Sequence, residues 1–127
     1  MVLTTTPQPG YLLATAEGPF RLENAQKQFL QLLDQIAQSG TDRVLFDGRK
    51  VTGEPTALER YLYGEFAAMA AAGMIIPQVI PAQRFAYVLN RPLLDPRRLG
   101  EITARNRAMD VKAFENVDDA LKWLLAR

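Results

Sequence analysis

Polar residues that could do chemistry follow two predicted strands. Residues 43–47 and 85–89 are short, largely apolar runs, a pattern typical of strands buried on both faces. The first run ends in Asp47, and Asn90 directly follows the second. In an open α/β sheet, ligands bind outside the carboxyl ends of the strands. Polar residues are also common in ordinary loops, so a binding site and a plain loop surface both account for them. The strand-end candidates are Asp47, Gly48, Arg49, Lys50, Thr52, Glu54, Thr56, Asn90 and Arg91.

The carboxylates in this set offer little catalytic chemistry. Asp47 and Glu54 together could transfer protons or hold Mg²⁺, but Arg49 beside Asp47 favours an ion pair that fixes the loop. The chain contains no His and no Cys, which excludes histidine-based acid–base catalysis, thiolate nucleophiles and zinc sites built on imidazole or thiolate. We therefore predict a protein that is not an enzyme, with no catalytic residue, no metal site and no cofactor.

Thr56 has two possible roles. Thr56 and Glu59 match the capping box, in which a threonine hydroxyl and a glutamate carboxylate satisfy the first backbone N–H groups of a helix. A hydroxyl at this place, near the positive end of the helix dipole, could also accept a phosphate. The cap accounts for the residue without further assumptions, and we favour it.

An apolar segment follows the predicted helix that starts at Thr56. Residues 74–83 contain two prolines and are predicted to form a loop, yet loops are normally polar. Three roles stay open: burial in the monomer, a surface for a protein partner or a second copy of the chain, and the lining of a pocket for an apolar ligand. The residues concerned are Phe66 and Met69 in the second half of the helix and, in the loop, Met74, Ile75, Ile76, Val79 and Ile80.

The order of elements predicts a single α/β domain over residues 1–127. Apolar periodicity and turn signals predict a sheet of about five strands, mostly parallel with the first strand antiparallel, flanked by four helices. For the second helix we expect a buried stripe of Leu58, Leu62, Phe66, Met69 and Ala70. The expected strands are 2–6, 11–16, 43–47, 85–89 and 111–114, and the expected helices are 22–39, 56–72, 95–107 and one that opens at Asn116 or Asp118.

The charge balance argues against nucleic acid as a partner. Lys and Arg number 15 and Asp and Glu 14, and Arg97 and Arg105 each lie four residues from Glu101, as in ion pairs along one helix. The longest apolar run, 66–76, is far shorter than the ~20 residues that span a bilayer. The first residues lack the basic region of a signal peptide. We expect a cytoplasmic protein without an integral membrane segment.

Three stretches together resemble the STAS domain, the SpoIIAA-like fold of anti-sigma factor antagonists. They are the strand and turn 43–49, the strand 84–90, and the closing segment in which residues 104–108, 111–114 and 119–124 follow one another. The resemblance implies the SpoIIAA-like α/β fold and a non-enzymatic regulatory or protein-interaction module. Related SEC14-like members imply an alternative, a small carrier of an apolar ligand or lipid, for which Phe66, Met69, Met74 and Ile76 would line the pocket.

One departure from the family concerns its phosphorylation switch. Phosphorylatable STAS proteins place an Asp-Ser pair at the start of the helix after the Asp-terminated strand. This chain has Pro55 and Thr56 there. The resemblance therefore implies a family module without a working switch.

Overall fold

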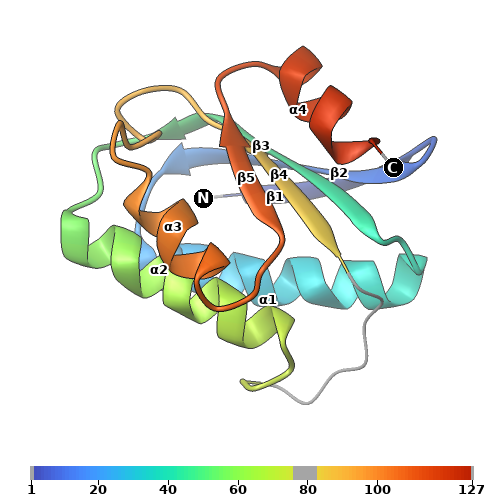
Figure 1. Cartoon of the computed structure of the whole chain (residues 1–127), viewed down its shortest axis with the longest axis horizontal. Coiled ribbons are helices and arrows are strands. Elements are labelled where there is room, and N and C mark those ends of the chain that lie inside the picture. Colours follow the sequence, from blue (N-terminus) through green and yellow to red (C-terminus); the bar gives the residue numbers. More distant parts are fainter. Residues whose placement is uncertain (1, 76–82, 127) are drawn as a thin grey trace.

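The computed structural model describes residues 2–75 and 83–126. Nine elements follow one another in the predicted order of strands and helices (Figure 1). They are β1 (Val2–Gln8), β2 (Tyr11–Pro19), α1 (Leu22–Ser39), β3 (Arg43–Thr52), α2 (Ala57–Ala71), β4 (Arg84–Val88), α3 (Leu99–Arg105), β5 (Val111–Phe114) and α4 (Val117–Leu124).

The five strands form one sheet in sequence order, β1-β2-β3-β4-β5. β1 and β2 pair antiparallel as a hairpin, and the other neighbours pair parallel, as the sequence predicts. The helices cover both faces, with α1, α2 and α3 on one side and α4 on the other (Figure 1). The sheet therefore has a thick core on one face and a thin one on the other.

The central strands are buried because their side chains alternate between these two cores. Phe46, Phe85 and Tyr87 pack toward α1 and α2, whereas Leu45 and Val88 pack under α4. The prediction that residues 43–47 and 85–89 form buried central strands is confirmed, with β4 ending one residue earlier at Val88.

The predicted end of the strand 43–47 is wrong, because β3 runs five residues further. β3 continues to Thr52, because its backbone pairs with β2 through Glu17 and Lys50, Gly18 and Val51, and Pro19 and Thr52. Backbone pairing decides this segment, and the polar side chains that suggest a loop simply point out of an extended strand.

α2 begins as predicted, but only part of the predicted stripe is buried: Ala70 is buried and Phe66 packs against the core, as expected. Thr56 caps the helix with the predicted capping box. Leu58, expected in the core, is 64% exposed, and the buried positions are small ones, Gly64, Ala67, Ala68 and Ala70. The cause is close helix packing, since a Cβ on Gly64 would lie 2.4 Å from the backbone oxygen of Gly100 in α3.

α3 starts later than predicted. Asp95 does not cap a helix at Pro96; its carboxylate accepts hydrogen bonds from the backbone N–H groups of Arg97 and Leu99 and holds a turn that leads into the helix. The predicted pairs of Glu101 with Arg97 and Arg105 are also wrong, because Glu101 pairs with Arg98 at 3.0 Å. At the end of the chain, Asn116 caps α4, one of the two predicted starts. Among the described residues, no helix is long and apolar enough to cross a membrane.

Candidate functional site

The strand-end candidates form a small polar cluster around Asp47. Arg49 donates to both carboxylate oxygens of Asp47, at 3.0 and 2.9 Å, and Asn90 donates from Nδ2 to the backbone oxygen of Arg49 at 3.2 Å. The Arg49 guanidinium holds the pKa of the Asp47 carboxyl below its usual value of 3.8, against burial, which would raise it. Asp47 and Arg49 thus form the predicted ion pair, although they lie within β3 and not in a loop.

Arg91 and Thr52, two other strand-end candidates, are not drawn into this cluster. Arg91 pairs with Glu115 at 3.2 Å on the exposed surface. Thr52 is exposed at the end of β3, five residues beyond Asp47. No group of three or more acidic, His or Cys side chains suited to a metal ion occurs among the residues that the structure describes. The cluster fixes local structure, and each of its charges is already engaged.

Thr56 lies exposed at the start of α2 with its hydroxyl engaged in the cap. Its Oγ1 accepts from the backbone N–H of Glu59 at 3.1 Å, and the Glu59 carboxylate accepts from the backbone N–H of Thr56 at 2.9 Å. The capping role is therefore directly visible. A carboxylate already occupies the positive end of the α2 dipole.

A cavity of about 150 Å³ lies between the sheet and the helices α2 and α3. Phe46 and Tyr87 form part of its sheet wall, and their rings stack with centroids 4.8 Å apart. The small residues Gly64, Ala67 and Gly100 line its helical side. The cavity exists because α2 and α3 pack closely on each other through glycines, which leaves no large side chain to fill the space beneath them.

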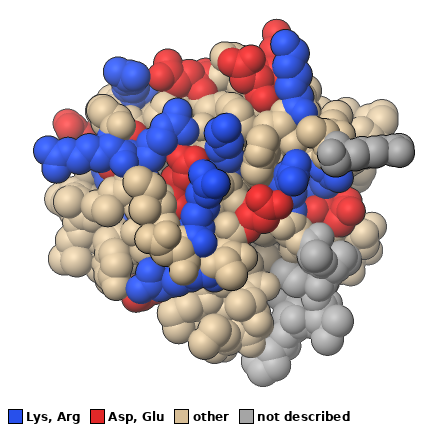
Figure 2. All heavy atoms as spheres, in the orientation of Figure 1, with Lys and Arg blue, Asp and Glu red and all other residues tan. Residues whose placement is uncertain are grey.

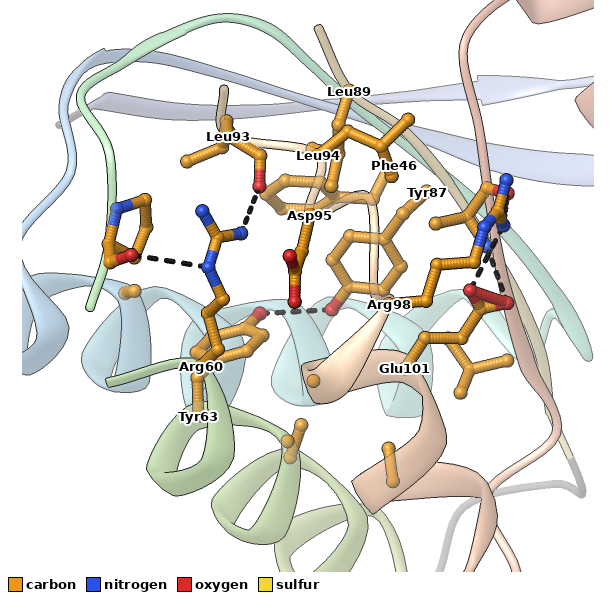
Figure 3. A pocket seen from close by; sticks show the side chains of 18 of the residues that line it. Phe46, Arg60, Tyr63, Tyr87, Leu89, Leu93, Leu94, Asp95, Arg98 and Glu101 are labelled. Carbon is orange, nitrogen blue, oxygen red and sulfur yellow. Dashed lines mark hydrogen bonds and ion pairs between the residues drawn. The ribbon is translucent and has the colours of Figure 1, made fainter. Parts of the chain in front are cut away.

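Two tyrosines place polar atoms inside this apolar cavity. Tyr63 from α2 and Tyr87 from β4 point toward each other, and their hydroxyl oxygens lie 2.9 Å apart (Figure 3). Burial raises the pKa of Tyr63 to about 12 and that of Tyr87 well above its ordinary value. Both hydroxyls are therefore neutral at physiological pH and act as hydrogen-bonding groups.

Four charged side chains line the cavity as well, and all are tied to neighbouring groups. Arg60 donates to the backbone oxygens of Pro55, Leu93 and Pro92. On the other side of the cavity, Arg98 donates to Glu101 and to the Ala113 oxygen (Figure 3).

The Asp95 carboxylate is the fourth charge, and it accepts from two backbone N–H groups. Burial would raise the pKa of Asp95, but these bonds, together with Arg60 and Arg97, lower it. The two arginines and the two carboxylates of the lining balance in charge, and each of the four side chains already makes hydrogen bonds.

Of the residues predicted to line an apolar pocket, those that the structure describes do not line this cavity. Phe66 and Met69 are partly buried elsewhere on α2, and Met74 and Ile75 are 69% and 40% exposed just beyond it. Ile76, Val79 and Ile80 lie outside the described residues. Sequence reasoning missed Tyr63 and Tyr87; Tyr87 alone carried a signal, a hydroxyl within a predicted buried strand.

Comparison with known proteins identifies the fold. No family model matches the chain, and no curated protein matches its sequence. The crystal structure of an anti-sigma factor antagonist from Mycobacterium paratuberculosis is similar, with a TM-score of 0.61, 14% sequence identity, and coverage of 98% of this chain and 94% of that chain. The chain therefore has the SpoIIAA-like STAS fold, which confirms the fold that the sequence resemblance implied.

Proposed function

We propose that this chain is a non-enzymatic protein-interaction module and that it meets its partner through the outer face of α2. The fold is that of a protein named as an antagonist of an anti-sigma factor, a function that consists of binding another protein. A single observation carries the proposal: the side of α2 that faces away from the core is apolar.

The outer face of α2 consists of residues that recur at three and four positions, as the neighbours along one side of a helix do. Leu58 and Tyr61 are exposed and Leu62 and Met69 are half-buried. An apolar helix face normally packs against a core, yet no described helix or strand buries Leu58 and Tyr61. The members of the face are Leu58, Tyr61, Leu62, Glu65, Met69 and Ala72.

The one charge on this face is neutralised. Glu65 accepts from Arg107 at 2.8 Å and from the Tyr61 hydroxyl at 2.9 Å. The Arg107 guanidinium also lies over the Tyr61 ring. In Figure 2 the molecular surface over α2 is mostly uncharged, and the charged side chains gather in the upper part of the view. Such a surface suits a protein partner with an apolar contact of its own.

The proposed module works without a phosphorylation switch. A phosphate on Thr56 would add about −1.5 to −2 charges beside the Glu59 carboxylate that already occupies the helix N-terminus. Like charges repel there, and the phosphate would also displace the capping bond from Glu59 to the Thr56 hydroxyl. We infer constitutive binding.

Site-specific photo-crosslinking in the producing cells tests this function. A benzophenone side chain at position 58 should form one discrete covalent product, either with a second copy or with one other protein identified by mass spectrometry. The matched control is position 125, because Leu125 is also an exposed leucine, at 43%, but lies beyond α4 on the opposite side of the sheet. Equal, diffuse labelling from both positions would contradict the proposal.

A further inference from the structure

The cavity beneath α2 and α3 plays no part in binding at the outer face of α2, yet it has the properties of a ligand site. Its volume is about 150 Å³. Apolar cavities of that size stay dry and take up molecules such as benzene or xenon. Pockets for drug-sized ligands measure about 300–1,000 Å³. The size thus selects a single-ring molecule and disfavours a whole lipid.

The tyrosine pair has one O–H donor for which the described residues provide no acceptor. Each tyrosine hydroxyl carries one proton, and a single bond joins the hydroxyls of Tyr63 and Tyr87. Within residues 2–75 and 83–126, neither hydroxyl has a second partner. One O–H group is therefore free to donate, and a buried donor without an acceptor is costly. A ligand that brings an acceptor oxygen or nitrogen to this pair removes that cost.

The charged groups around the cavity select against an ionic ligand. Arg60 donates from Nε, Nη1 and Nη2 to backbone oxygens, and Arg98 donates from Nη1 to Glu101 and to the Ala113 oxygen. Asp95 accepts from two backbone N–H groups. These two positive and two negative side chains already balance, so a charged ligand would add an uncompensated charge at the cavity, whereas a neutral one adds none.

We propose that this cavity binds a small, neutral, single-ring molecule whose one hydrogen-bond acceptor meets the Tyr63–Tyr87 hydroxyl pair. The ring packs between the aromatic sheet wall of Phe46 and Tyr87 and the small residues of α2. The protein then combines a partner surface on the outside of α2 with a ligand site on its inside.

Two probes of nearly the same shape test the site. Benzonitrile carries an acceptor nitrogen, and phenylacetylene replaces that nitrogen with C–H. Calorimetry or ligand-observed NMR should show saturable binding of benzonitrile to the whole chain at one site, roughly 3- to 10-fold tighter than phenylacetylene, since a hydrogen bond contributes that much net affinity. The nitrile infrared band should shift as it does on hydrogen bonding.

The double variant Tyr63→Phe/Tyr87→Phe keeps the ring packing and removes both hydroxyls. It should still bind phenylacetylene, while the preference for benzonitrile and the infrared shift disappear. A preference that survives in this variant would overturn the role of the tyrosine pair.

A cavity-filling variant tests the location. Ala67→Leu adds side-chain volume inside the cavity and should abolish binding of both probes. Ala37→Leu adds the same volume at an exposed position of α1 that does not line the cavity and should leave binding unchanged. Melting curves verify that each variant is folded, and the tyrosine variants decide the question if Ala67→Leu unfolds. A folded wild-type chain that binds neither probe would refute the proposal.

Discussion

A single hydroxyl illustrates how a residue can resemble a regulatory site and serve a structural purpose. Thr56 stands at the position for which the sequence resemblance suggests a phosphorylation site, but both halves of a capping box are present around it. The bonds that complete the cap are the ones that a phosphate would disrupt. The structural role therefore follows from hydrogen bonds, and residue type alone is compatible with both roles.

We expect Thr56→Ala to lower the free energy of unfolding by about 1 kcal/mol, the usual cost of a lost N-cap. Chemical denaturation monitored by circular dichroism measures the change. Thr52→Ala is the matched control, because Thr52 is an exposed threonine at the end of β3 whose backbone oxygen, and not its side chain, accepts from Phe20. It should change stability by less than about 0.5 kcal/mol. Equal losses in the two variants would mean that the cap contributes nothing.

The Asp47–Arg49 pair predicts a small acid-dependent loss of stability. The pKa of Asp47 is lower in the folded protein than its ordinary value of 3.8, so the carboxylate form is favoured by folding. This contribution is fully present above the unfolded-state pKa and is lost as the pH falls through the folded-state pKa. Because Arg49 is largely exposed, we expect less than about 1 kcal/mol.

A double-mutant cycle isolates this effect. Urea denaturation of the wild type should show a steeper loss of stability below about pH 4 than the same measurement on Asp47→Asn. Arg49→Gln should flatten the profile in the same way, and the double variant should add nothing further. Additive effects of the two substitutions would show that the pair is not coupled.

At the scale of elements, sequence patterns predict the order of strands and helices but misplace several boundaries and one buried face. The two central strands are correct because short, continuous apolar runs are typical of strands that are covered on both faces. β3 extends beyond its predicted end because a neighbouring strand supplies hydrogen bonds to residues 50–52, a tertiary effect that no local pattern encodes. The start of α3 is displaced because Asp95 caps a turn in place of a helix.

The buried face of α2 shows why a hydrophobic stripe alone can mislead. Size mattered more than hydrophobicity, since Gly64 and the alanines let α2 approach α3 closely, and the larger side chains, such as Leu58, then face outward. The same close approach creates the cavity. The glycines are visible in the sequence, but their pairing across two helices is a long-range property.

We therefore expect Gly64→Ala to destabilise the protein although alanine is the better helix former. Helix propensity favours alanine by about 1 kcal/mol, but the new methyl group would lie 2.4 Å from the Gly100 oxygen, and overpacking typically costs about 1–3 kcal/mol. The net result should be a loss measured by thermal or urea unfolding. Gly100→Ala should cost less, because its nearest contact is 3.1 Å away. A stabilised Gly64→Ala variant would show that the helices separate easily.

On the scale of the whole molecule, the fold puts α2 between two different environments. Its inner side borders the cavity and its outer side is apolar and open. Met74 and Ile75 extend the apolar exposure beyond the end of the helix. A helix of 15 residues is about 22 Å long, which gives a contact of useful length to a second copy of itself.

These features predict a homodimer in solution. Most small homo-oligomers are two-fold dimers in which the same surface meets itself, and a self-complementary apolar helix face fits that arrangement. Burial of Leu58 and Tyr61 against a second α2 would remove the exposed patch that monomers rarely tolerate. Light scattering at micromolar concentration should give twice the mass of one chain.

The decisive variants place a charge on this face without touching the core. Leu58→Asp, and independently Ile75→Asp, should yield monomers with unchanged circular dichroism, because both side chains are exposed in the single chain. Leu125→Asp, on the opposite side of the sheet, should remain dimeric. A wild-type chain that is monomeric would assign the outer face of α2 to a different protein, whereas a dimer that survives Leu58→Asp and Ile75→Asp would place the interface elsewhere on the molecule.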